Sequence, residues 1–475
     1  MMNSPISELD PDRALPADQV IRPLAKDIYA QVADLPIVSM HGHVEAEVFL
    51  NNEPFGNPTE MLVIPDHYLV RMLVSQGLTH AELGVARQDG APVEQDARTI
   101  WRRFCENWKL FRGTPTRFWL EHELAVVFGT SLRPSAENAD ALFDALSAAL
   151  ETEAFRPRAL LDRFNVEILA TTDSALSDLT AHHKLREVAG RDRIVPTFRP
   201  DSLLHVNQPA WRTEIGQLSD VSGVEVGDYR SFLAALRQRR DAFLAAGARA
   251  TDHGHLSADT SPLPAAEADR IFAAALRGEA TAEEAEAFSG NMLFEMARMS
   301  VEDGLVMQLH PGVLRNHCDA VQDLYGADKG FDMPVKVEFT RSLRPMLNSF
   351  GMNKDFRFIA FTTDETVYSR ELAPLAGAYP AMKLGAPWWF LDSPEQMRRF
   401  RESAMETAGF YNTSGFVDDT RALASIPARH DLARRIDSGY LARLVAEGRL
   451  SLAEAVETAV DLTYYLPLQS YAPRS

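Results

Sequence analysis

Short runs of apolar, often β-branched residues recur along the chain, and each run ends in polar side chains. Stretches with the apolar spacing of helices lie between most of these runs. Strands that alternate with helices indicate β–α–β units and a parallel sheet. Eight such units predict an α/β fold of the (β/α)8, or TIM barrel, type. The runs are residues 35–43, 164–173, 191–201, 247–255, 303–312, 355–364, 378–390 and 414–421.

The spacing of these runs is uneven, and the long intervals have helical patterns. The interval between the first and second runs is too long for one crossover helix, so it predicts a helical insertion at about 50–160 over the mouth of the barrel. A second helical stretch is expected over 264–302, and a C-terminal helical segment over 436–475. The whole chain, 1–475, is therefore interpreted as one barrel domain with these additions.

Three helix starts are marked by their sequence. Thr281 with Glu284, and Ser451 with the glutamate three positions later, match the capping box, in which two side chains satisfy free backbone N–H groups. Asp66 precedes the apolar stretch "HYLVRMLV" and is expected to cap the helix that begins there.

Composition narrows the class of protein. The chain has 475 residues, 46% of them hydrophobic, and a net charge of −19 without any Lys/Arg-rich run. A sizeable core can form, and nucleic-acid binding is disfavoured because it needs a basic surface. Cys105 and Cys318 are the two cysteines, which excludes a disulfide framework and a cysteine-rich zinc site. The polar start "MMNSPISELDPDRALPADQ" is unlike a signal peptide, and no apolar run is long enough to span a membrane, so we expect a cytoplasmic location.

Polar side chains of functional types follow the predicted strands. In a barrel of this kind the active site lies at the carboxyl ends of the strands. Each case alone is weak, because solvated loops also favour polar residues. The residues at these positions are His41, His43, Asp173, Arg199, Asp201, Asp252, His253, His310, Asp364, Trp388, Trp389, Asp419 and Arg421.

His41 and His43 form a His-x-His pair at the end of the first run. Side chains two positions apart on a strand face the same side, so both rings can bind one metal ion. With 13 histidines, about 0.4 such pairs are expected by chance and two occur, so the pattern alone does not decide. The second pair, His253 and His255, follows a weaker strand and is interpreted as a polar loop, although His253 could face the site.

Several long stretches carry a resemblance to a known family. They are "HGHVEAEVFLNNEPFGNPTEMLVIPDHYLVRMLVSQG", "FWLEHELAVVFG", "FNVEILATTDSALSDLTAHH", "RIVPTFRPD", "MQLHPGVLRN", "KLGAPWWF" and "DDTRALASIPARHDLARR". Together they span roughly 37–436, and they resemble the uronate isomerase family of the amidohydrolase superfamily of metal-dependent barrels. Three positions depart from the family pattern: Ser39 stands where an aspartate is usual, "TTDSA" replaces "TTDDP", and "VDDTRAL" replaces "TDSRSF", which aligns Asp419 and Arg421 with the family's Asp and Arg.

The resemblance implies an aldose–ketose isomerase that converts D-glucuronate, D-galacturonate or both into the ketose acid through an enediol. It implies one divalent metal ion, with zinc expected and Mn, Co or Ni as alternatives. The implied ligands are His41, His43 and Asp419. His310 is either a further ligand or a histidine that binds substrate or orients the ligands.

The resemblance also implies roles for the remaining residues. Tyr68 and Asp419 are the candidates for proton transfer, and a nearby cation would lower the pKa of the tyrosine. Arg421 would stabilise the enediol or keep Asp419 ionised. The alternatives are a Tyr68 that packs on an apolar helix face and an Arg421 in a structural ion pair.

The substrate carboxylate needs cationic partners. Arg199 and Arg315 are expected to bind it through their planar guanidinium groups. His67 is expected to bind substrate, and Trp388 and Trp389 to form a wall of the pocket, with a core role for one of them as the alternative.

Two other functions remain open from the sequence. A hydrolase or decarboxylase can use the same barrel and metal, since fold does not fix function; the fourth run lacks the lysine common in the superfamily's hydrolases, which favours the isomerase. A catalytically inactive sugar-acid binder would need the arginines but not the metal set. We expect a small-molecule uronate as partner, no nucleic acid or membrane, and a homo-oligomer.

Overall fold

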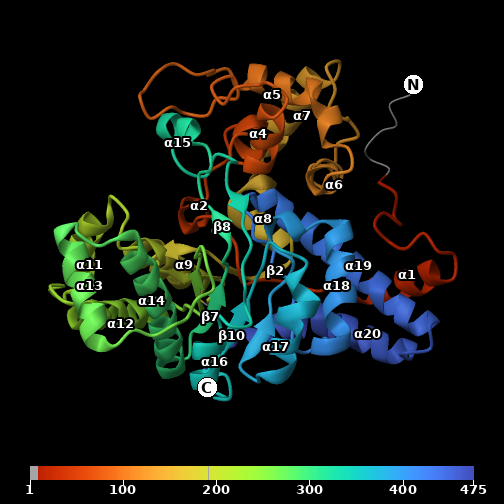
Figure 1. Ribbon diagram of the computed structural model, residues 1–475. Coiled ribbons are helices and arrows are strands. Elements are labelled where there is room, and N and C mark those ends of the chain that lie inside the picture. The colour runs from red at the N-terminus through yellow and green to blue at the C-terminus, as the bar shows by residue number, and fades with distance from the viewer. Residues whose placement is uncertain (1–8, 191, 475) are drawn as a thin grey trace.

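The computed structural model describes residues 9–190 and 192–474, and its strands form two parallel sheets and one small antiparallel pair, β8 (Val313–Leu314) with β9 (Met333–Pro334) (Figure 1). The smaller sheet has the order β1-β2-β4, with β1 at Ile37–Ser39, β2 at Val166–Ala170 and β4 at Ile194–Val195. The larger sheet has the order β11-β10-β7-β6-β5-β3. Its strands are β3 (Asp173–Ser174), β5 (Phe198–Arg199), β6 (Ala250–His253), β7 (Val306–Leu309), β10 (Phe358–Ala360) and β11 (Met382–Leu384).

Seven of the eight predicted runs contain strands, and neighbouring runs pair in the order of the chain. The second and third runs each contribute to both sheets, because β2 pairs with β4 and β3 pairs with β5 in the same direction. The two sheets therefore continue into each other along these runs. The third run was expected to begin at residue 191, which lies outside the described residues, as do residues 1–8 at the start of the chain.

The eighth predicted run differs from the expectation. Within the described residues, 414–421 forms no strand, and only Thr413 makes a parallel bridge to Leu384. The backbone turns into the left-handed region at Gly415 (φ 82°) and Asp419 (φ 42°), which interrupts an extended ladder. The segment still reaches the first strand, because the Asp419 N–H donates to the His41 carbonyl over 3.1 Å.

The strand side chains alternate between two apolar clusters, as the two-residue period of a strand requires. On β7, Val306 packs in the cluster between the strands, whereas Met307 and Leu309 pack toward the surrounding helices. Between them, Gln308 is fully buried, and its Oε1 accepts a hydrogen bond of 2.8 Å from the hydroxyl of Tyr471. The C-terminal tyrosine thus fills the space between the strands and satisfies a buried polar group there.

Helices cover the strands on two sides (Figure 1). One group, drawn in green, consists of α11 (Trp211–Ser222), α12 (Tyr229–Ala245), α13 (Ala265–Arg277) and α14 (Ala282–Asp303). The other, drawn in blue, includes α17 (Ala373–Ala378), α18 (Pro394–Ala408), α19 (Ile426–Ala446) and α20 (Leu452–Val460), with α1 (Ile21–Val32) packed against α19 and α20. The predicted capping boxes at the starts of α14 and α20 are both present. Position 436, where we expected the C-terminal segment to begin, lies inside α19.

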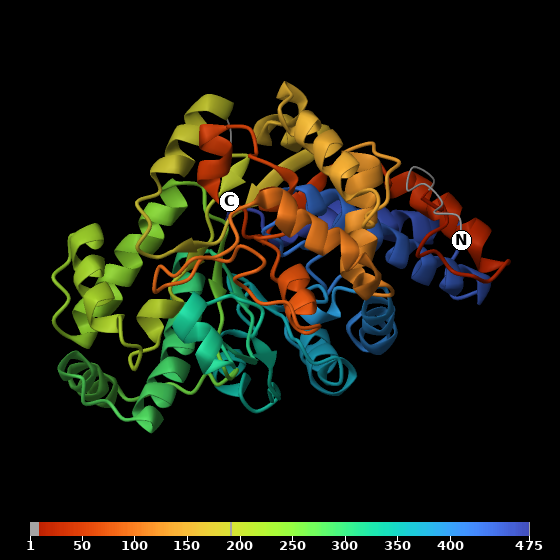
Figure 2. The same ribbon diagram turned by 90° about the horizontal axis from the view of Figure 1, so that it is seen from above.

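The chain between β1 and β2 is helical and has its own apolar cluster. Its helices are α2 (Ala46–Asn51), α3 (Pro58–Leu62), α4 (His67–Val74), α5 (Ala97–Glu106), α6 (Pro115–His122), α7 (Ala139–Leu150) and α8 (Pro157–Arg163). Seen from above, the orange part of this segment lies across the middle of the molecule (Figure 2). It meets the segment after β7, because the Gln88 N–H donates to the carbonyl of Leu324 in α15 (Asp319–Tyr325) over 2.8 Å.

Two further sequence expectations can be compared with the fold. Both cysteines are free, with Cys105 buried. Within residues 9–190 and 192–474, no helix is both long enough and apolar enough to cross a membrane.

Candidate active site

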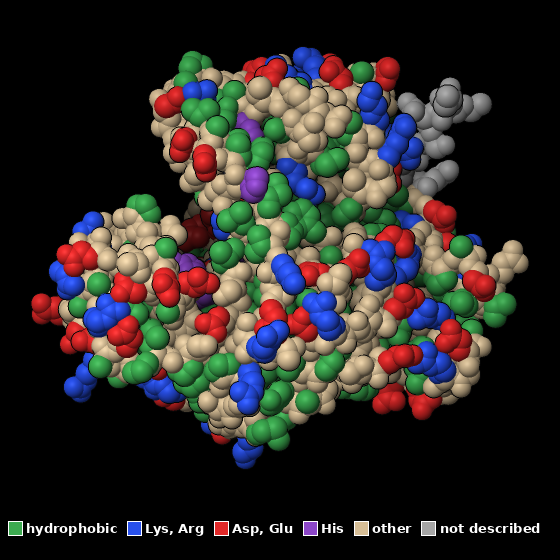
Figure 3. Space-filling model, viewed as in Figure 1, with side chains coloured by type: hydrophobic (Ala, Val, Ile, Leu, Met, Phe, Trp, Pro, Cys, Tyr) green, Lys and Arg blue, Asp and Glu red, His purple; other side chains and the backbone are tan. Residues whose placement is uncertain are grey.

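A cavity of about 340 Å³ is lined by all eleven residues that were expected to act in catalysis, substrate binding or metal binding, whereas the other strand-end candidates Asp173, Asp201, His253 and Asp364 do not line it. It lies where the strands end beneath the helices that follow β1, and Figure 3 shows a recess below those helices in which histidine and acidic side chains are visible. Its lining includes His41, His43, His67, Tyr68, Arg199, Arg315, His310, Trp388, Trp389, Asp419 and Arg421. Residues from six parts of the chain therefore meet at one place, as the ends of parallel strands predict.

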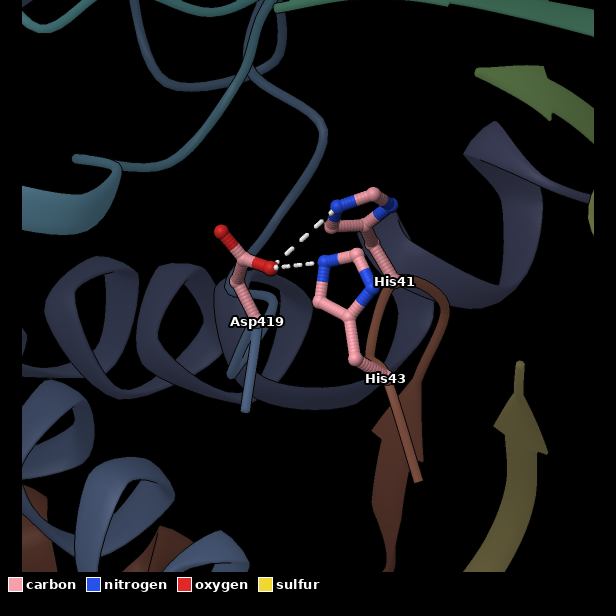
Figure 4. A group of neighbouring side chains, drawn as sticks. All are labelled: His41, His43 and Asp419. Atoms are coloured by element: carbon pink, nitrogen blue, oxygen red, sulfur yellow. Dashed lines mark ion pairs between the residues drawn. The ribbon is translucent and has the colours of Figure 1, made fainter. Parts of the chain in front are cut away.

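Two histidines and one carboxylate meet at the centre of this cavity (Figure 4). Asp419 Oδ1 lies 3.3 Å from Nε2 of His41 and 2.8 Å from Nε2 of His43. Figure 4 shows the second carboxylate oxygen directed away from both rings. Asp419 holds this position with φ 42°, a conformation that most residues with a side chain avoid, so the backbone is strained at this residue.

The donor set fits a divalent cation. Potential ligand atoms of His41, His43 and Asp419 all lie within 4.8 Å of one another, and two imidazoles with a carboxylate are ligands that zinc accepts. The trio leaves room for further ligands, since catalytic zinc sites keep a position for water or substrate. The geometry is thus compatible with the predicted metal centre.

His310 stands beside the trio. Its ring stacks on that of His41 with 4.4 Å between centroids, and its Nδ1 lies 2.6 Å from Oδ1 of Asp252. Its Nε2 is buried without a hydrogen-bond partner. An imidazole held by a carboxylate on one nitrogen and free on the other can serve as a ligand or can contact substrate, so both interpretations remain.

The four arginines that line the cavity are each paired with a carboxylate. Arg199 Nε lies 2.8 Å from Asp201 and its Nη1 lies 3.2 Å from Asp252. Arg315 Nη1 lies 2.7 Å from Asp332, and the side chain is 41% exposed, so most of its guanidinium is free to bind an anion. Burial would raise the pKa of Asp252, but Arg199, His310 and His41 together lower it well below its usual value.

Arg421 pairs with a carboxylate that also lines the cavity. Its Nη2 lies 2.7 Å from Oδ2 of Asp328. Among the described residues, Arg421 makes no ion pair or hydrogen bond with Asp419. The guanidinium still lines the cavity, so a contact with substrate remains open to it.

Tyr68 sits in the first turn of α4, and the predicted cap fixes it there. Asp66 Oδ1 accepts hydrogen bonds from the backbone N–H groups of Tyr68 (2.8 Å) and Leu69 (3.3 Å). Burial, with the charges of Asp392 and Asp419, raises the pKa of Tyr68 well above its ordinary value. The expected lowering is therefore not supplied by the protein's own side chains, and only a bound cation could provide it.

Arg429, which lines the cavity, and its buried partner Asp392 were missed by the sequence analysis. Arg429 pairs with Asp392 through Nη1, and its guanidinium lies 3.6 Å from the ring centroid of Trp119 and 5.7 Å from that of Tyr68. Burial, only partly offset by Arg429, raises the pKa of Asp392 to about 8. The stretch "IPARHDLARR" contains Arg429, but the partners come from distant parts of the chain, so no local signal marks it.

The two tryptophans occupy both expected positions, the wall of the pocket and the core. Trp388 and Trp389 line the cavity and also belong to the buried cluster between the strands. Trp389 adopts φ 56°, and its ring lies 6.1 Å from that of His67 and 5.4 Å from the guanidinium of Arg315. Burial lowers the pKa of His67 to about 4, so this histidine is neutral at pH 7 and can accept or donate a hydrogen bond to substrate.

The interpretation of the second His-x-His pair as a polar loop is wrong. His253 is the last residue of β6, and both His253 and His255 are buried. Neither lines the cavity, so His253 does not face the site as we had considered. The weak apolar character of "ARATD" concealed a strand whose small side chains pack between larger neighbours.

Comparisons with known proteins identify the family of the chain. The family model described as glucuronate isomerase matches residues 19–471. The uronate isomerase of Rhizobium meliloti is 52% identical over 98% of this chain and 99% of its own length. The crystal structure of glucuronate isomerase from Caulobacter crescentus superposes with a TM-score of 0.96 and 48% identity, covering 99% of this chain and 98% of that one. The uronate isomerase from Thermotoga maritima superposes with a TM-score of 0.90 and 27% identity, over 98% of this chain and 99% of its own.

Proposed function

The chain belongs to the glucuronate isomerase family and is a uronate isomerase, and we propose that it interconverts D-glucuronate with D-fructuronate, D-galacturonate with D-tagaturonate, or both. The observation that carries this proposal is that one cavity is lined by His41, His43, Asp419 and Tyr68 together with four arginines, among them Arg199, Arg315 and Arg421. An acidic sugar needs cationic partners, and an isomerisation needs charge stabilisation and a proton carrier; the cavity offers all three.

The proposed reaction moves one proton from C2 to C1. A base removes the proton from C2 of the aldose, the electron pair forms the C1–C2 double bond, and the carbonyl oxygen O1 takes up a proton to give the enediol. The proton of O2 then leaves, the carbonyl forms at C2, and C1 takes up a proton. No atom is gained or lost between aldose and ketose.

Side chains of the cavity are assigned to these steps. His41, His43 and Asp419 would hold one divalent ion, zinc or alternatively Mn, Co or Ni, with His310 as a further ligand or a substrate contact. Such an ion supplies Lewis-acid stabilisation of developing negative charge on a carbonyl oxygen. Tyr68 or Asp419 carries the proton, and Arg421 stabilises the charge of the enediol.

The substrate carboxylate is assigned to Arg315 and Arg199. Arg315 has most of its donors free, which supports a two-point contact with a carboxylate. Arg199 bridges two aspartates and offers fewer free donors. His67, Trp388 and Trp389 complete the wall that excludes water from the sugar.

We also propose that the strand-bearing segments close into a (β/α)8 barrel with the helices of about 50–160 as an insertion. The hydrogen bonds from Asp419 N–H to His41 and from His43 N–H to Thr420 support closure, because they join the eighth run to the first. The homo-oligomeric state and the cytoplasmic location stay predictions from the sequence.

The proposal is tested by incubating the purified protein with glucuronate and, separately, with galacturonate, and following the ketose acids by NMR. Accumulation of either ketose acid supports the proposal and fixes the preferred substrate. Release of a fragment or of carbon dioxide instead would identify a hydrolase or decarboxylase. Binding of both sugars without conversion, in protein loaded with zinc, would identify a sugar-acid binder.

A further inference from the structure

A second group of potential metal ligands lies outside the cavity. It consists of Asp201, the first residue of α10 (Asp201–Leu204), His253 at the end of β6, and His255 two residues later. One potential ligand atom from each lies within 4.8 Å of the other two. His253 and His255 are 0% and 3% exposed, and the Asp201 side chain is 16% exposed, so the two histidines are shielded from bulk water.

Each of the three side chains has one polar atom that is buried without a partner. These atoms are Asp201 Oδ1, His253 Nδ1 and His255 Nε2. A buried polar atom without a partner costs free energy of about 1–3 kcal/mol, and buried polar groups in proteins are nearly always satisfied. Three such atoms on three neighbouring side chains indicate that one shared partner belongs between them.

The other polar atom of each side chain is anchored. Asp201 Oδ2 accepts from Arg199 Nε (2.8 Å) and from the Gly254 N–H (2.9 Å). His253 Nε2 lies 3.0 Å from the Thr251 hydroxyl, and His255 Nδ1 lies 2.8 Å from the Ser289 hydroxyl. When each imidazole donates its N–H to the hydroxyl, its free nitrogen presents a lone pair. Metal-binding histidines are oriented in this way by a hydrogen bond at the second nitrogen.

We propose that Asp201 Oδ1, His253 Nδ1 and His255 Nε2 bind a second divalent cation of the zinc type, separate from the one assigned to His41, His43 and Asp419. Two imidazoles and one carboxylate are ligands that Zn²⁺ takes in three-ligand sites. A cation satisfies three acceptor lone pairs at once, whereas a water molecule can donate only two hydrogen bonds.

The second site is joined to the cavity through Arg199. This guanidinium contacts Asp201 on one side and Asp252, which lines the cavity, on the other. Gly254 makes the contact possible, because a Cβ at that position would lie 2.7 Å from Arg199 Nη2 and 3.0 Å from Asp201 Oδ2. The proposed ion therefore acts as a positioning element: it fixes Asp201, and Asp201 fixes the arginine. This inference does not rest on the reaction proposed above.

The metal content of the full chain tests the inference. Protein stripped with a chelator is saturated with Zn²⁺, freed of excess metal by gel filtration, and analysed for zinc per chain by mass spectrometry. We expect two equivalents for the unchanged protein and one for the His43→Gln variant, which disables only the cavity site. One equivalent for the unchanged protein together with none for His43→Gln would overturn the proposal, and would do so without any measurement of activity.

Variants at the second site test which residues bind the second ion. His255→Gln should bind one equivalent, whereas His183→Gln, which changes an exposed histidine on α9 (Thr180–Ala189), should bind two. Co²⁺ can replace Zn²⁺ in the His43→Gln variant, and Co²⁺ bound at the low-coordinate second site should then give a visible absorption band. This measurement leaves the residues of the second site unchanged. Two zinc equivalents retained in a folded His255→Gln would place the second ion elsewhere and refute the assignment.

Discussion

Arg429 and Asp392 form an ion pair in the buried wall behind Tyr68, with the guanidinium lying 5.7 Å from the centre of the tyrosine ring. The two charges act on the tyrosine in opposite directions. Asp392 raises the pKa of Tyr68 and Arg429 lowers it, in an environment where burial already raises it. The pair therefore sets how easily Tyr68 gives up its proton.

Removal of these two charges should change turnover by different amounts. Arg429→Met removes the positive neighbour, and a shift of one pKa unit corresponds to about 1.4 kcal/mol, or about tenfold in rate if Tyr68 loses its proton in the rate-limiting step. We expect kcat to fall by about 10–100-fold with KM little changed. Asp392→Asn keeps an acceptor for Arg429, and because the pKa of Asp392 is raised to about 8 this side chain is mostly uncharged at pH 7, so kcat should change little. Equal losses in both variants would show that the pair serves packing alone.

Arg315→Met should weaken binding of the uronate far more than binding of the uncharged parent sugar. A charge-assisted hydrogen bond contributes about 1.5–3 kcal/mol, or roughly 10–150-fold in affinity. Arg315 is a cleaner choice than Arg199, whose loss would leave Asp201 and Asp252 without their partner. Calorimetric titration with both ligands measures the difference. Arg277→Met, an exposed change on α13, is the matched control, and an equal loss for acid and neutral sugar would make Arg315 a structural residue.

Tyr68→Phe removes the hydroxyl and keeps the ring, so it isolates the proton-transfer role. We expect turnover to fall by about 10²–10⁴, the usual contribution of a general acid or base. Tyr411→Phe, at an exposed tyrosine, should leave turnover unchanged. In deuterated water the unchanged enzyme should place deuterium on C1 of the ketose. An active Tyr68→Phe with complete transfer of a C2 deuterium label to C1 would instead favour a direct hydride shift.

Glu123 gives a prediction about stability and pH. It is buried in the π-helical turn η2 (Glu123–Val127) after α6, and burial, with the charge of Asp66, raises its pKa to about 8. In the unfolded chain this side chain loses its proton near the ordinary glutamate pKa of about 4.3. Between these values the folded state keeps a proton that the unfolded state has lost, so raising the pH destabilises the fold by up to about 1.4 kcal/mol per unit.

The Glu123→Gln variant should therefore gain in stability relative to the unchanged protein as the pH rises. The gain is small near pH 5 and grows toward pH 8, because glutamine has no proton to lose. Urea midpoints measured across this range give the comparison, with the exposed Glu151→Gln as control. A constant difference between variant and unchanged protein over the whole range would mean that Glu123 is ionised in the fold.

The local patterns in the sequence predicted much of this fold for clear reasons. The strand of His41 and His43, the cap at Asp66 and the two capping boxes depend on neighbours within a few residues, and each is present. The eighth run was expected to be a strand because "SGFV" is apolar, but the turns at Gly415 and Asp419 lie within it. The identity of residue 419 as an aspartate gives no sign that its backbone adopts a positive φ.

Long-range pairs account for what the sequence analysis missed. Asp392 and Arg429 are 37 positions apart, and Arg240 pairs with Asp303 across 63, so no spacing rule brings either pair together. The burial of His253 and His255 likewise depends on α10 and α14, which pack over the end of β6. Family resemblance found the cavity residues because it carries such distant relationships within its motifs.

The left-handed backbone at Asp419 restricts how this position can evolve. Asparagine and glycine tolerate that conformation but lack the carboxylate. Glutamate has the carboxylate, but its side chain is one methylene longer and it adopts a positive φ less readily than aspartate. No single substitution therefore preserves both properties. In a laboratory selection, any sequence that abandons the aspartate must acquire a compensating change elsewhere in the same step, so this position should remain fixed while its neighbours drift.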